Sequence, residues 1–407
     1  MNVKKQAIIN AFGNLVYVAA LWMLTVITTQ RLGYEANGYL TLAMTITNLS
    51  VAVQLYGVRS FQSSDMSFEY SAKDYLFSRL FTLVFGFVFG LIVCLLREYD
   101  RIVLIPIILF MILKAAEAFS DVLYGNVQRV GRLEIAGYFM FARGILIVVF
   151  FGVSVWFTSD LNKSLLFIAL LCVVLSFAIE LMAHNKLIVS DSAFSIRKTF
   201  GVIRECFPLF IASVIPIFIT AYPRIILEKY YGSELLGFYG NVSTPSLLIT
   251  TLAPVVLTAL LPSYGIAYKN EDKQKILKIW LMSVFGCLVF GVISFVVMIF
   301  LAKPVLTLVY TEQILPYVIY LYPVIAAVVI YSFCMCSYTA LIAIRKKTMV
   351  IVSAFIALVI CLIVSNCLIK PYSIKGAIAV LIITYLVQFV IQCICFFKAL
   401  RHLKYRS

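Results

Sequence analysis

The sequence predicts an all-α membrane protein whose twelve transmembrane helices form two six-helix halves of similar plan. Three observations predict this fold class: the composition, a row of apolar stretches, and a loop motif that occurs once in each half. Of the 407 residues, 63% are hydrophobic and only 13% are charged, whereas about 25% of the residues in soluble domains are charged. So much apolar surface needs lipid as its solvent rather than one water-soluble core.

The transmembrane helices are read from apolar stretches, because a helix needs about 20 such residues to cross a bilayer. Twelve stretches of this kind follow one another: 6–30, 36–59, 76–96, 102–127, 135–157, 164–187, 204–227, 236–261, 277–301, 315–343, 348–369 and 374–398. Their connections are short, so we expect no large domain outside the membrane. The polar stretch 61–75 is a candidate surface helix, and no cleavage site follows the first apolar stretch, which we therefore expect to be retained.

The two halves are indicated by the motif G-x-E-x-x-G-aromatic, which occurs at Gly33–Tyr39 and again at Gly232–Phe238. Each copy lies between two apolar stretches, where glycine can provide a tight turn between antiparallel helices. We therefore expect an N-terminal lobe at 1–190, a cytoplasmic linker at 191–203 and a C-terminal lobe at 204–407. Both loops then face the same side, so the lobes form a parallel pseudo-repeat.

The distribution of positive charge predicts the orientation. With the N-terminus in the cytoplasm, the cytoplasmic segments hold more than twice as many of the 33 Lys and Arg residues as the outer segments. The positive-inside rule therefore places both termini in the cytoplasm. The same rule accounts for most of the formal charge of +15, so we expect no nucleic-acid partner. The ten cysteines lie in or near apolar runs as small apolar side chains, and we expect neither a metal site nor a cofactor.

Charged residues within the apolar stretches are the candidate site. A charge at mid-bilayer costs at least about 2.5–3.5 kcal/mol and usually faces a partner or a cavity. In the stretch 102–127, helical spacing places Lys114, Glu117 and Asp121 on one face. Arg143, in the next helix, lies at about the depth of Asp121 if the two helices are neighbours. Two interpretations stay open: Arg143–Asp121 and Lys114–Glu117 ion pairs that hold the lobe together, or a cationic cavity wall tuned by these acids.

Four further charged residues lie near the ends of helices, where long side chains can reach water. Arg59, Arg224 and Arg31 are candidates for contact with a substrate. Glu180, near the inner end of the sixth helix, joins Glu117 and Asp121 as a candidate to bind a coupling H⁺ or Na⁺.

The sequence contains no enzyme signature. It has two histidines and no nucleotide-binding P-loop, metal cluster or Ser/His/Asp set. We therefore expect that the protein is not an enzyme and does not hydrolyse ATP to drive transport.

Several weak motifs across nearly the whole chain resemble the polysaccharide flippases of the multidrug/oligosaccharidyl-lipid/polysaccharide (MOP) exporter superfamily. That family typically has asparagines in its first helix, followed by an R-x-L-G-x-x-x-x-G-x-Y/F turn. The corresponding residues here are Asn10, Asn14 and Arg31-Leu32-Gly33 through Gly38-Tyr39, with one residue fewer between Arg and Gly. Gly237-Phe238-Tyr239 and Tyr56-Gly57-Val58-Arg59 are also similar, whereas Tyr222-Pro223-Arg224 has a basic residue where many relatives have an acidic one.

The resemblance implies a MATE-like fold and a flippase for undecaprenyl-pyrophosphate-linked oligosaccharide repeat units in a bacterial plasma membrane. Such a protein moves these units to the outer leaflet by alternating access between its lobes, for capsule, O-antigen or exopolysaccharide synthesis. Its partners are the lipid-linked oligosaccharide, the lipid bilayer and, in assembly, a polysaccharide polymerase and a chain-length regulator. Lys114 and Arg143, with Arg59, Arg224 and Arg31, would neutralise the pyrophosphate.

Three other functions stay open. A multidrug/cation antiporter of the same superfamily is expected to have an acid in the first helix, and 6–30 contains none. A membrane polysaccharide polymerase, which is an enzyme, usually has a large outer loop that this chain lacks. A lipid II flippase usually has additional helices.

Overall fold

The protein is α-helical throughout the part of the chain that the structure describes, and none of these residues forms a β-strand. The structure is a computed structural model that describes residues 3–65, 69–187, 195–246, 250, 257, 260 and 263–401. Nine of its helices are long and apolar enough to cross a membrane. The predicted fold class, an all-α polytopic membrane protein, is therefore confirmed.

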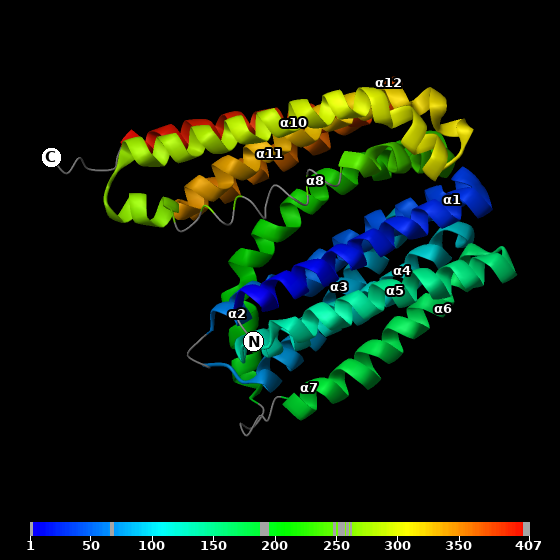
Figure 1. The fold of residues 1–407 in the computed structure, drawn as a ribbon, viewed down its shortest axis with the longest axis horizontal. Helices are drawn as coiled ribbons and strands as arrows, with labels where there is room; N and C mark the ends of the chain where they lie inside the picture. Colours follow the sequence, from blue (N-terminus) through cyan, green and yellow to red (C-terminus); the bar gives the residue numbers. More distant parts are fainter. Residues whose placement is uncertain are drawn as a thin grey trace. The chain divides into compact units, whose positions relative to one another are not determined.

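The helices follow one another as Figure 1 labels them. Their bounds are α1 Val3–Leu55, α2 Val58–Ser64, α3 Ala72–Arg97, α4 Arg101–Arg129, α5 Leu133–Thr158, α6 Leu161–Val174, a π-helix Leu175–Glu180, α7 Leu181–Leu187, α8 Ile196–Ser243, a 3-10 helix Thr244–Ser246, α10 Lys273–Val309, a 3-10 helix Glu312–Tyr320, α11 Leu321–Ala343 and α12 Lys347–Arg401.

Three of these helices, α1, α8 and α12, are each two arms joined at one non-helical residue; the arms have membrane length except the second arm of α8, which ends at Ser243 after 11 residues. The breaks are at Gly33 (φ 87°, ψ 178°), Gly232 (φ 80°, ψ 174°) and Ser373 (φ 53°, ψ −128°). Each break separates two predicted spans, so the arms and the remaining helices correspond to eleven of the twelve predicted stretches and to the beginning of the eighth. Much of the predicted helix 236–261 after Ser246 lies outside the described residues, as do positions 191–194 of the predicted linker.

The two glycine turns have nearly the same backbone conformation. A positive φ combined with a ψ near 180° is accessible essentially only to glycine. Nothing lies within 4 Å of a Cβ placed on Gly33 or Gly232, so the backbone angles rather than space select glycine here. The repeated motif thus marks the same local structure in both halves of the chain.

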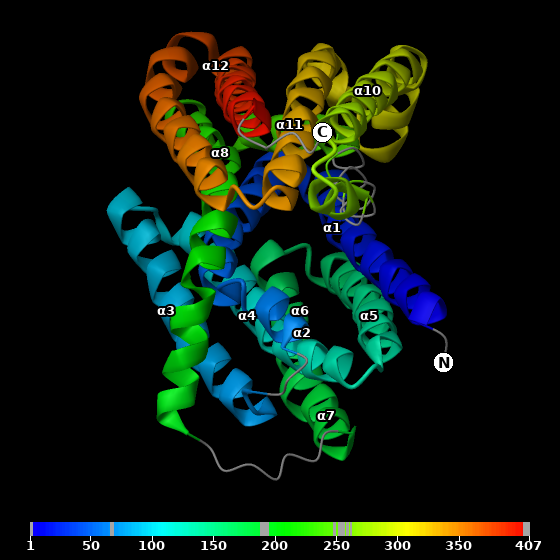
Figure 2. The ribbon, with the colours of Figure 1, turned by 90° about the vertical axis from the view of Figure 1, so that its left-hand side faces the viewer.

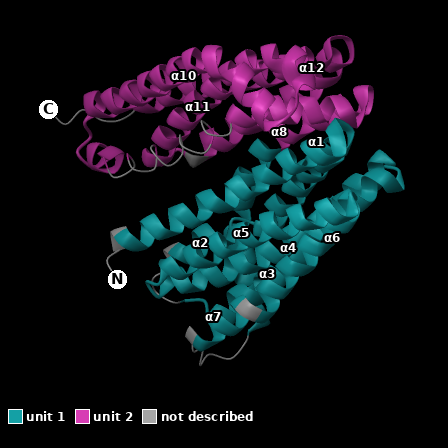
Figure 3. Ribbon diagram, turned by 45° about the vertical axis from the view of Figure 1, so that its right-hand side comes forward, with its two compact units in different colours: residues 1–217 teal, residues 218–407 magenta. Residues whose placement is uncertain are grey.

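The chain divides into two compact units, residues 1–217 and 218–407, which Figure 3 shows in different colours. The division falls within α8, because the beginning of this helix packs on unit 1. Val202 and Cys206 are buried against α2, α3 and α4 side chains, and Phe210 stacks on Tyr56 with ring centroids 4.4 Å apart. The lobe limits expected from the sequence, with a linker at 191–203, stay a prediction.

Unit 1 is built around α1, which packs against α3, α4 and α5, while α4 also packs against α6 (Figure 2). The predicted helix 36–59 ends at Leu55, because Tyr56 and Gly57 have φ of 50° and 66°. Of the candidate surface helix expected at 61–75, residues 61–64 belong to the seven-residue α2, which begins at Val58, and residues 72–75 begin α3, so no single helix covers the described part of this stretch.

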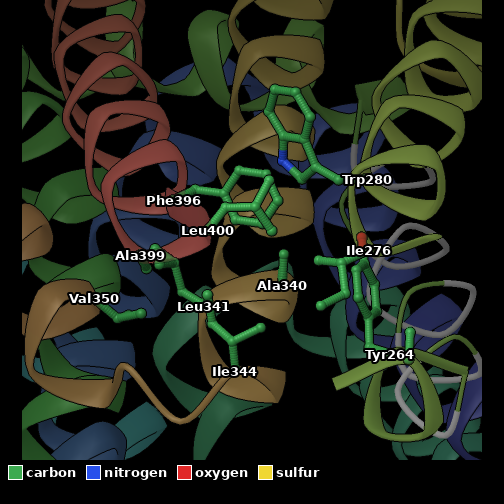
Figure 4. Close-up of a cluster of buried hydrophobic side chains, with 11 residues drawn as sticks. Tyr264, Ile276, Trp280, Ala340, Leu341, Ile344, Val350, Phe396, Ala399 and Leu400 are labelled. Atoms are coloured by element: carbon green, nitrogen blue, oxygen red, sulfur yellow. The ribbon is translucent and has the colours of Figure 1, made fainter. Parts of the chain in front are cut away.

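Unit 2 has its own core at one end of α10, α11 and α12. Figure 4 shows Trp280 of α10 and Phe396 of α12 pointing toward one another, and their ring centroids are 5.2 Å apart. Trp280 also donates a hydrogen bond from Nε1 to the Ser337 hydroxyl of α11, at 3.2 Å. One aromatic side chain therefore ties three membrane helices together.

Candidate functional site

A cavity of about 220 Å³ lies within unit 1, and both apolar and titratable side chains line it. Its titratable lining residues are Tyr17, Arg59, Lys114, Glu117, Asp121, Tyr124 and Arg143. The structure thus brings together five of the eight residues that the sequence proposed as substrate or ion contacts. Their functional roles stay predictions.

Helix α4 contributes one polar stripe to this wall. Lys114, Glu117, Asp121 and Tyr124 are three or four residues apart and therefore share one helix face, and all four line the cavity. The opposite side of α4 packs into the core, where Phe119 and Leu123 are at most 2% exposed. The polar face expected from the sequence is therefore present.

A close crossing of α1 and α5 places Tyr17 in the cavity. A Cβ on Gly13 would lie 2.1 Å from the carbonyl oxygen of Gly137, and a Cβ on Gly137 would lie 2.7 Å from Cα of Asn10. Further along the same two helices, a Cβ on Gly144 would lie 3.0 Å from Cα of Tyr17. The two backbones touch only because these positions have no side chain.

Lys114 and Glu117 form the ion pair expected from their spacing. The Nζ atom of Lys114 lies 2.8 Å from Oε2 of Glu117 and 2.7 Å from the Tyr17 hydroxyl oxygen. The Tyr17 hydroxyl in turn donates a hydrogen bond to Oε1 of Glu117. The three groups form a closed ring of charge-assisted hydrogen bonds.

Asp121 joins two arginines, and the expected Arg143–Asp121 pair is wrong. Oδ1 of Asp121 accepts from Nη1 of Arg59 at 3.0 Å, and Oδ2 accepts from Nη2 of Arg79 at 3.0 Å. The Arg79 side chain is fully buried and also donates to the Gln54 carbonyl oxygen. The sequence did not identify Arg79 as a partner of Asp121, because its position near a helix end suggested a cytoplasmic charge.

Arg143 pairs with Glu180 instead. The distance from Nη2 of Arg143 to Oε1 of Glu180 is 2.7 Å, and the two side chains are 4% and 2% exposed. Nη2 also donates to the hydroxyls of Ser120 and Ser176, both at 2.8 Å. Arg143 therefore lies at the depth that the sequence predicted, next to Ser120, but turns toward the π-helix that carries Ser176 and Glu180.

The charges of this network nearly cancel. Arg59, Arg79, Lys114 and Arg143 are paired with the carboxylates of Glu117, Asp121 and Glu180, so four cations meet three anions. Buried charges persist in an apolar environment only when they are paired and hydrogen-bonded. Five of these seven residues line the cavity, whereas Arg79 and Glu180 do not, so the ion-pair network forms part of the cavity wall, and the choice between a structural and a substrate-contacting role stays a prediction.

Three of the eight predicted contacts do not line this cavity: Glu180, which pairs with Arg143, and Arg31 and Arg224, which lie elsewhere in the described part of the chain. The guanidinium of Arg31 lies 3.9 Å from the ring centroid of Trp156. The guanidinium of Arg224, in unit 2, lies 5.9 Å from the ring centroid of Tyr239. Neither residue is among those that line the unit 1 cavity.

A second buried ion pair in unit 1 anchors the start of α3. Oδ2 of Asp65 accepts from Nη2 of Arg129 at 3.0 Å and from the Tyr75 hydroxyl at 2.9 Å. Burial alone would raise the pKa of Asp65, but hydrogen bonds from the backbone of Glu69 and Tyr70, the Tyr75 hydroxyl and the charge of Arg129 together lower it below its ordinary value. This Tyr–Asp–Arg group does not line the cavity.

Comparison with known proteins supports the fold and gives a partial sequence relative. No protein-family model matches the chain. Over 216 residues, 52% of this chain, the sequence is 26% identical to the capsular polysaccharide biosynthesis protein CapF of Staphylococcus aureus. The match spans 54% of the length of that relative.

The solved structures that resemble the protein are membrane transporters and a flippase. An inward-facing MATE multidrug resistance transporter of the MOP superfamily superposes with a TM-score of 0.74 at 14% identity, over 97% of this chain and 99% of that one. The lipid II flippase MurJ in an inward closed conformation gives 0.72 at 14% identity, over 97% and 89%. The MATE multidrug transporter DinF-BH gives 0.67 at 12% identity, over 99% and 96%.

These likenesses define the class of protein. The chain is a multi-pass membrane protein with the fold shared by MATE transporters and the flippase MurJ. The MATE-like architecture expected from the motifs is thus confirmed, and the resemblance to the MOP superfamily is confirmed at the level of the fold. At identities of 12–14%, the structural likeness establishes the fold alone.

Proposed function

We propose that the protein is a flippase for undecaprenyl-pyrophosphate-linked oligosaccharide repeat units, which it moves from the inner to the outer leaflet of a bacterial plasma membrane by alternating access. The observation that carries the proposal is the unit 1 cavity, whose wall presents Lys114 and Arg143 from the membrane-length helices α4 and α5, together with Arg59 from the short helix α2. A pyrophosphate cannot cross hydrocarbon without compensating charge, and guanidinium and ammonium groups are the side chains that bind phosphate best.

The size of the cavity limits what it holds. About 220 Å³ is below the ~300–1,000 Å³ of pockets for drug-sized ligands, so the cavity can take a phosphate group but not a whole oligosaccharide. In the proposed mechanism the pyrophosphate reaches these cations while the sugars and the lipid tail remain outside this cavity.

The relatives support the substrate class and the absence of an enzymatic step. The sequence relative is named for capsular polysaccharide biosynthesis, and one structural neighbour is named a lipid II flippase. We therefore place this chain in capsule or related surface-polysaccharide synthesis, as a transporter rather than an enzyme. The lipid-linked oligosaccharide is its substrate, and a polysaccharide polymerase and a chain-length regulator are its proposed partners.

Orientation and energy coupling complete the proposal. The excess of Lys and Arg in alternate connections places both termini in the cytoplasm. Glu117, Asp121 and Glu180 are the carboxylates to which a coupling H⁺ or Na⁺ could bind, because all three belong to the buried network.

A multidrug/cation antiporter is the second candidate, favoured by the MATE neighbours. Such a protein needs carboxylates that can accept a cationic drug. Here each cavity carboxylate already accepts from a cation of the protein, which favours an anionic substrate over a cationic one. Resistance of expressing cells to cationic drugs would support the antiporter instead.

Complementation of a flippase-null strain tests the proposal. The wild-type chain should restore surface polysaccharide, and Lys114→Ala should abolish this restoration while the protein still inserts. Lys163→Ala is the matched control, because Lys163 also pairs with an acid three residues away, Asp160, but is 66% exposed. Full activity of Lys114→Ala would contradict a role for the cavity cations in transport.

A further inference from the structure

The three carboxylates of the ion-pair network share one arrangement: each accepts hydrogen bonds from a cation that lines the cavity and also from a second donor. Asp121 accepts from Arg59 and from Arg79. Glu180 accepts on Oε1 from Arg143 at 2.7 Å and from the Tyr124 hydroxyl at 2.9 Å.

Glu117 follows the same rule. It accepts from Lys114 on Oε2 and from the Tyr17 hydroxyl on Oε1. The three second donors come from three different helices, α1 for Tyr17, α3 for Arg79 and α4 for Tyr124. The spacing of residues along one helix therefore does not explain why each carboxylate has a second donor.

The second donors matter because every cation of the cavity is already paired. An arriving phosphate must draw a cation away from its carboxylate. A buried carboxylate that is left without any hydrogen-bond donor destabilises the protein by its full desolvation free energy. With a second donor in place, the carboxylate keeps a hydrogen bond while the cation turns to the phosphate. The exchange then costs much less than breaking an isolated buried ion pair.

We infer that Tyr17, Arg79 and Tyr124 are positioning residues that hold the three carboxylates while Lys114, Arg59 and Arg143 engage the pyrophosphate of the substrate. This inference rests on the proposed function, because it assumes that an anion enters the cavity. Arg59 is the cation most readily released: its side chain is 27% exposed, whereas Arg79, on the same carboxylate, is fully buried.

The inference predicts which residues depend on each other. Tyr124→Phe removes only the hydroxyl, so Arg143 becomes the one remaining strong donor to Glu180 and is harder to release. The protein should therefore bind inorganic pyrophosphate about tenfold more weakly. In Glu180→Gln the side chain is neutral and needs no second donor. Adding Tyr124→Phe to Glu180→Gln should therefore change pyrophosphate affinity less than about twofold.

The experiment is calorimetric titration of inorganic pyrophosphate into the purified full-length protein in lipid nanodiscs, for wild type, both single variants and the double variant. Tyr75→Phe is the matched control, since it removes a hydroxyl from the Asp65–Arg129 pair outside the cavity. It should lower stability and leave pyrophosphate affinity unchanged. If Glu180→Gln does not fold, Tyr17→Phe with and without Glu117→Gln makes the same comparison at a carboxylate that is 15% exposed.

Two results overturn the inference and leave the proposed function standing: unchanged pyrophosphate affinity in Tyr124→Phe, or the same loss from Tyr124→Phe whether residue 180 is Glu or Gln. If the wild-type protein binds no pyrophosphate, the anion site of the proposed function fails and the inference fails with it.

Discussion

Nη2 of Arg143 lies 2.7 Å from Oε1 of Glu180, and both side chains are almost completely buried among helices that cross the membrane. Removing one member of a buried pair leaves an uncompensated charge, which typically costs about 3–5 kcal/mol. We therefore expect Glu180→Ala to lower the stability of the purified protein by about this amount in a thermal or denaturant unfolding assay.

A matched control makes this prediction specific. Lys163→Ala breaks a pair whose atoms are 3.8 Å apart and whose side chains are 66% and 36% exposed, so it should cost at most about 1 kcal/mol. Replacing both Arg143 and Glu180 by apolar residues should cost less than Glu180→Ala alone, because no lone charge remains. Equal losses for Glu180→Ala and Lys163→Ala would show that the Arg143–Glu180 pair is solvated.

The two glycine turns give a second prediction. Gly33→Ala and Gly232→Ala force a side chain into a backbone conformation that only glycine adopts easily, so each should destabilise the protein by about 1–3 kcal/mol. Gly286→Ala is the control, because Gly286 lies inside helix α10 with nothing within 4 Å of its Cβ. That change should be neutral or stabilising by up to about 1 kcal/mol. Similar unfolding midpoints for all three variants would contradict the glycine-only backbone conformation at Gly33 and Gly232.

The helix crossing at Gly13 and Gly137 gives a third prediction. A Cβ on Gly137 would meet the Ile9 carbonyl oxygen at 2.6 Å, so Gly137→Ala must push α1 away from α5 and should cost about 1–3 kcal/mol. Because the same crossing places Tyr17 beside Lys114, pyrophosphate affinity should fall in parallel. Gly152→Ala is the control on the same helix, where the nearest atom is a side-chain methyl group 3.7 Å away. An unchanged unfolding midpoint for Gly137→Ala would contradict the close crossing.

A fourth prediction concerns pH and the Asp65–Arg129 pair. The folded-state pKa of Asp65 is lowered, whereas an unfolded Asp has a pKa of about 3.9. The ionised carboxylate therefore contributes stability that is fully present above about pH 5 and is lost as the pH falls through the folded-state pKa. The stability advantage of wild type over Asp65→Asn should shrink when unfolding is measured from about pH 7 down to about pH 3.5. A difference that is constant across this range would contradict the lowered pKa.

Features encoded within one segment could be predicted from the sequence. Spacing within one helix placed Lys114, Glu117 and Asp121 on a common face, and the glycine motif located the turns at Gly33 and Gly232. Depth in the membrane also followed from counting residues, which put Arg143 level with Ser120.

Features that depend on how helices rotate against each other could not be predicted. Residue counting gives the depth of Arg143 but not the direction in which its side chain points, so its pairing with Glu180 on the π-helix was missed. That Arg79 belongs to the ion-pair network could be seen only from the fold of the segment after α1. That Tyr17 belongs to it could be seen only from the helix crossing at Gly13 and Gly137. No local pattern carries these relationships.

The central claim is that the protein moves a pyrophosphate-linked oligosaccharide across the bilayer with the help of the cavity cations. The most direct test measures how fast the oligosaccharide headgroup of undecaprenyl-pyrophosphate-linked repeat units becomes accessible on the opposite side of vesicles that contain the purified protein. We expect vesicles with wild type or Lys163→Ala to translocate the headgroup much faster than protein-free vesicles. Lys114→Ala should lower the wild-type translocation rate at least about tenfold, because it removes a single charge-assisted contact. A wild-type rate equal to that of protein-free vesicles, or a Lys114→Ala rate equal to wild type, would contradict the claim.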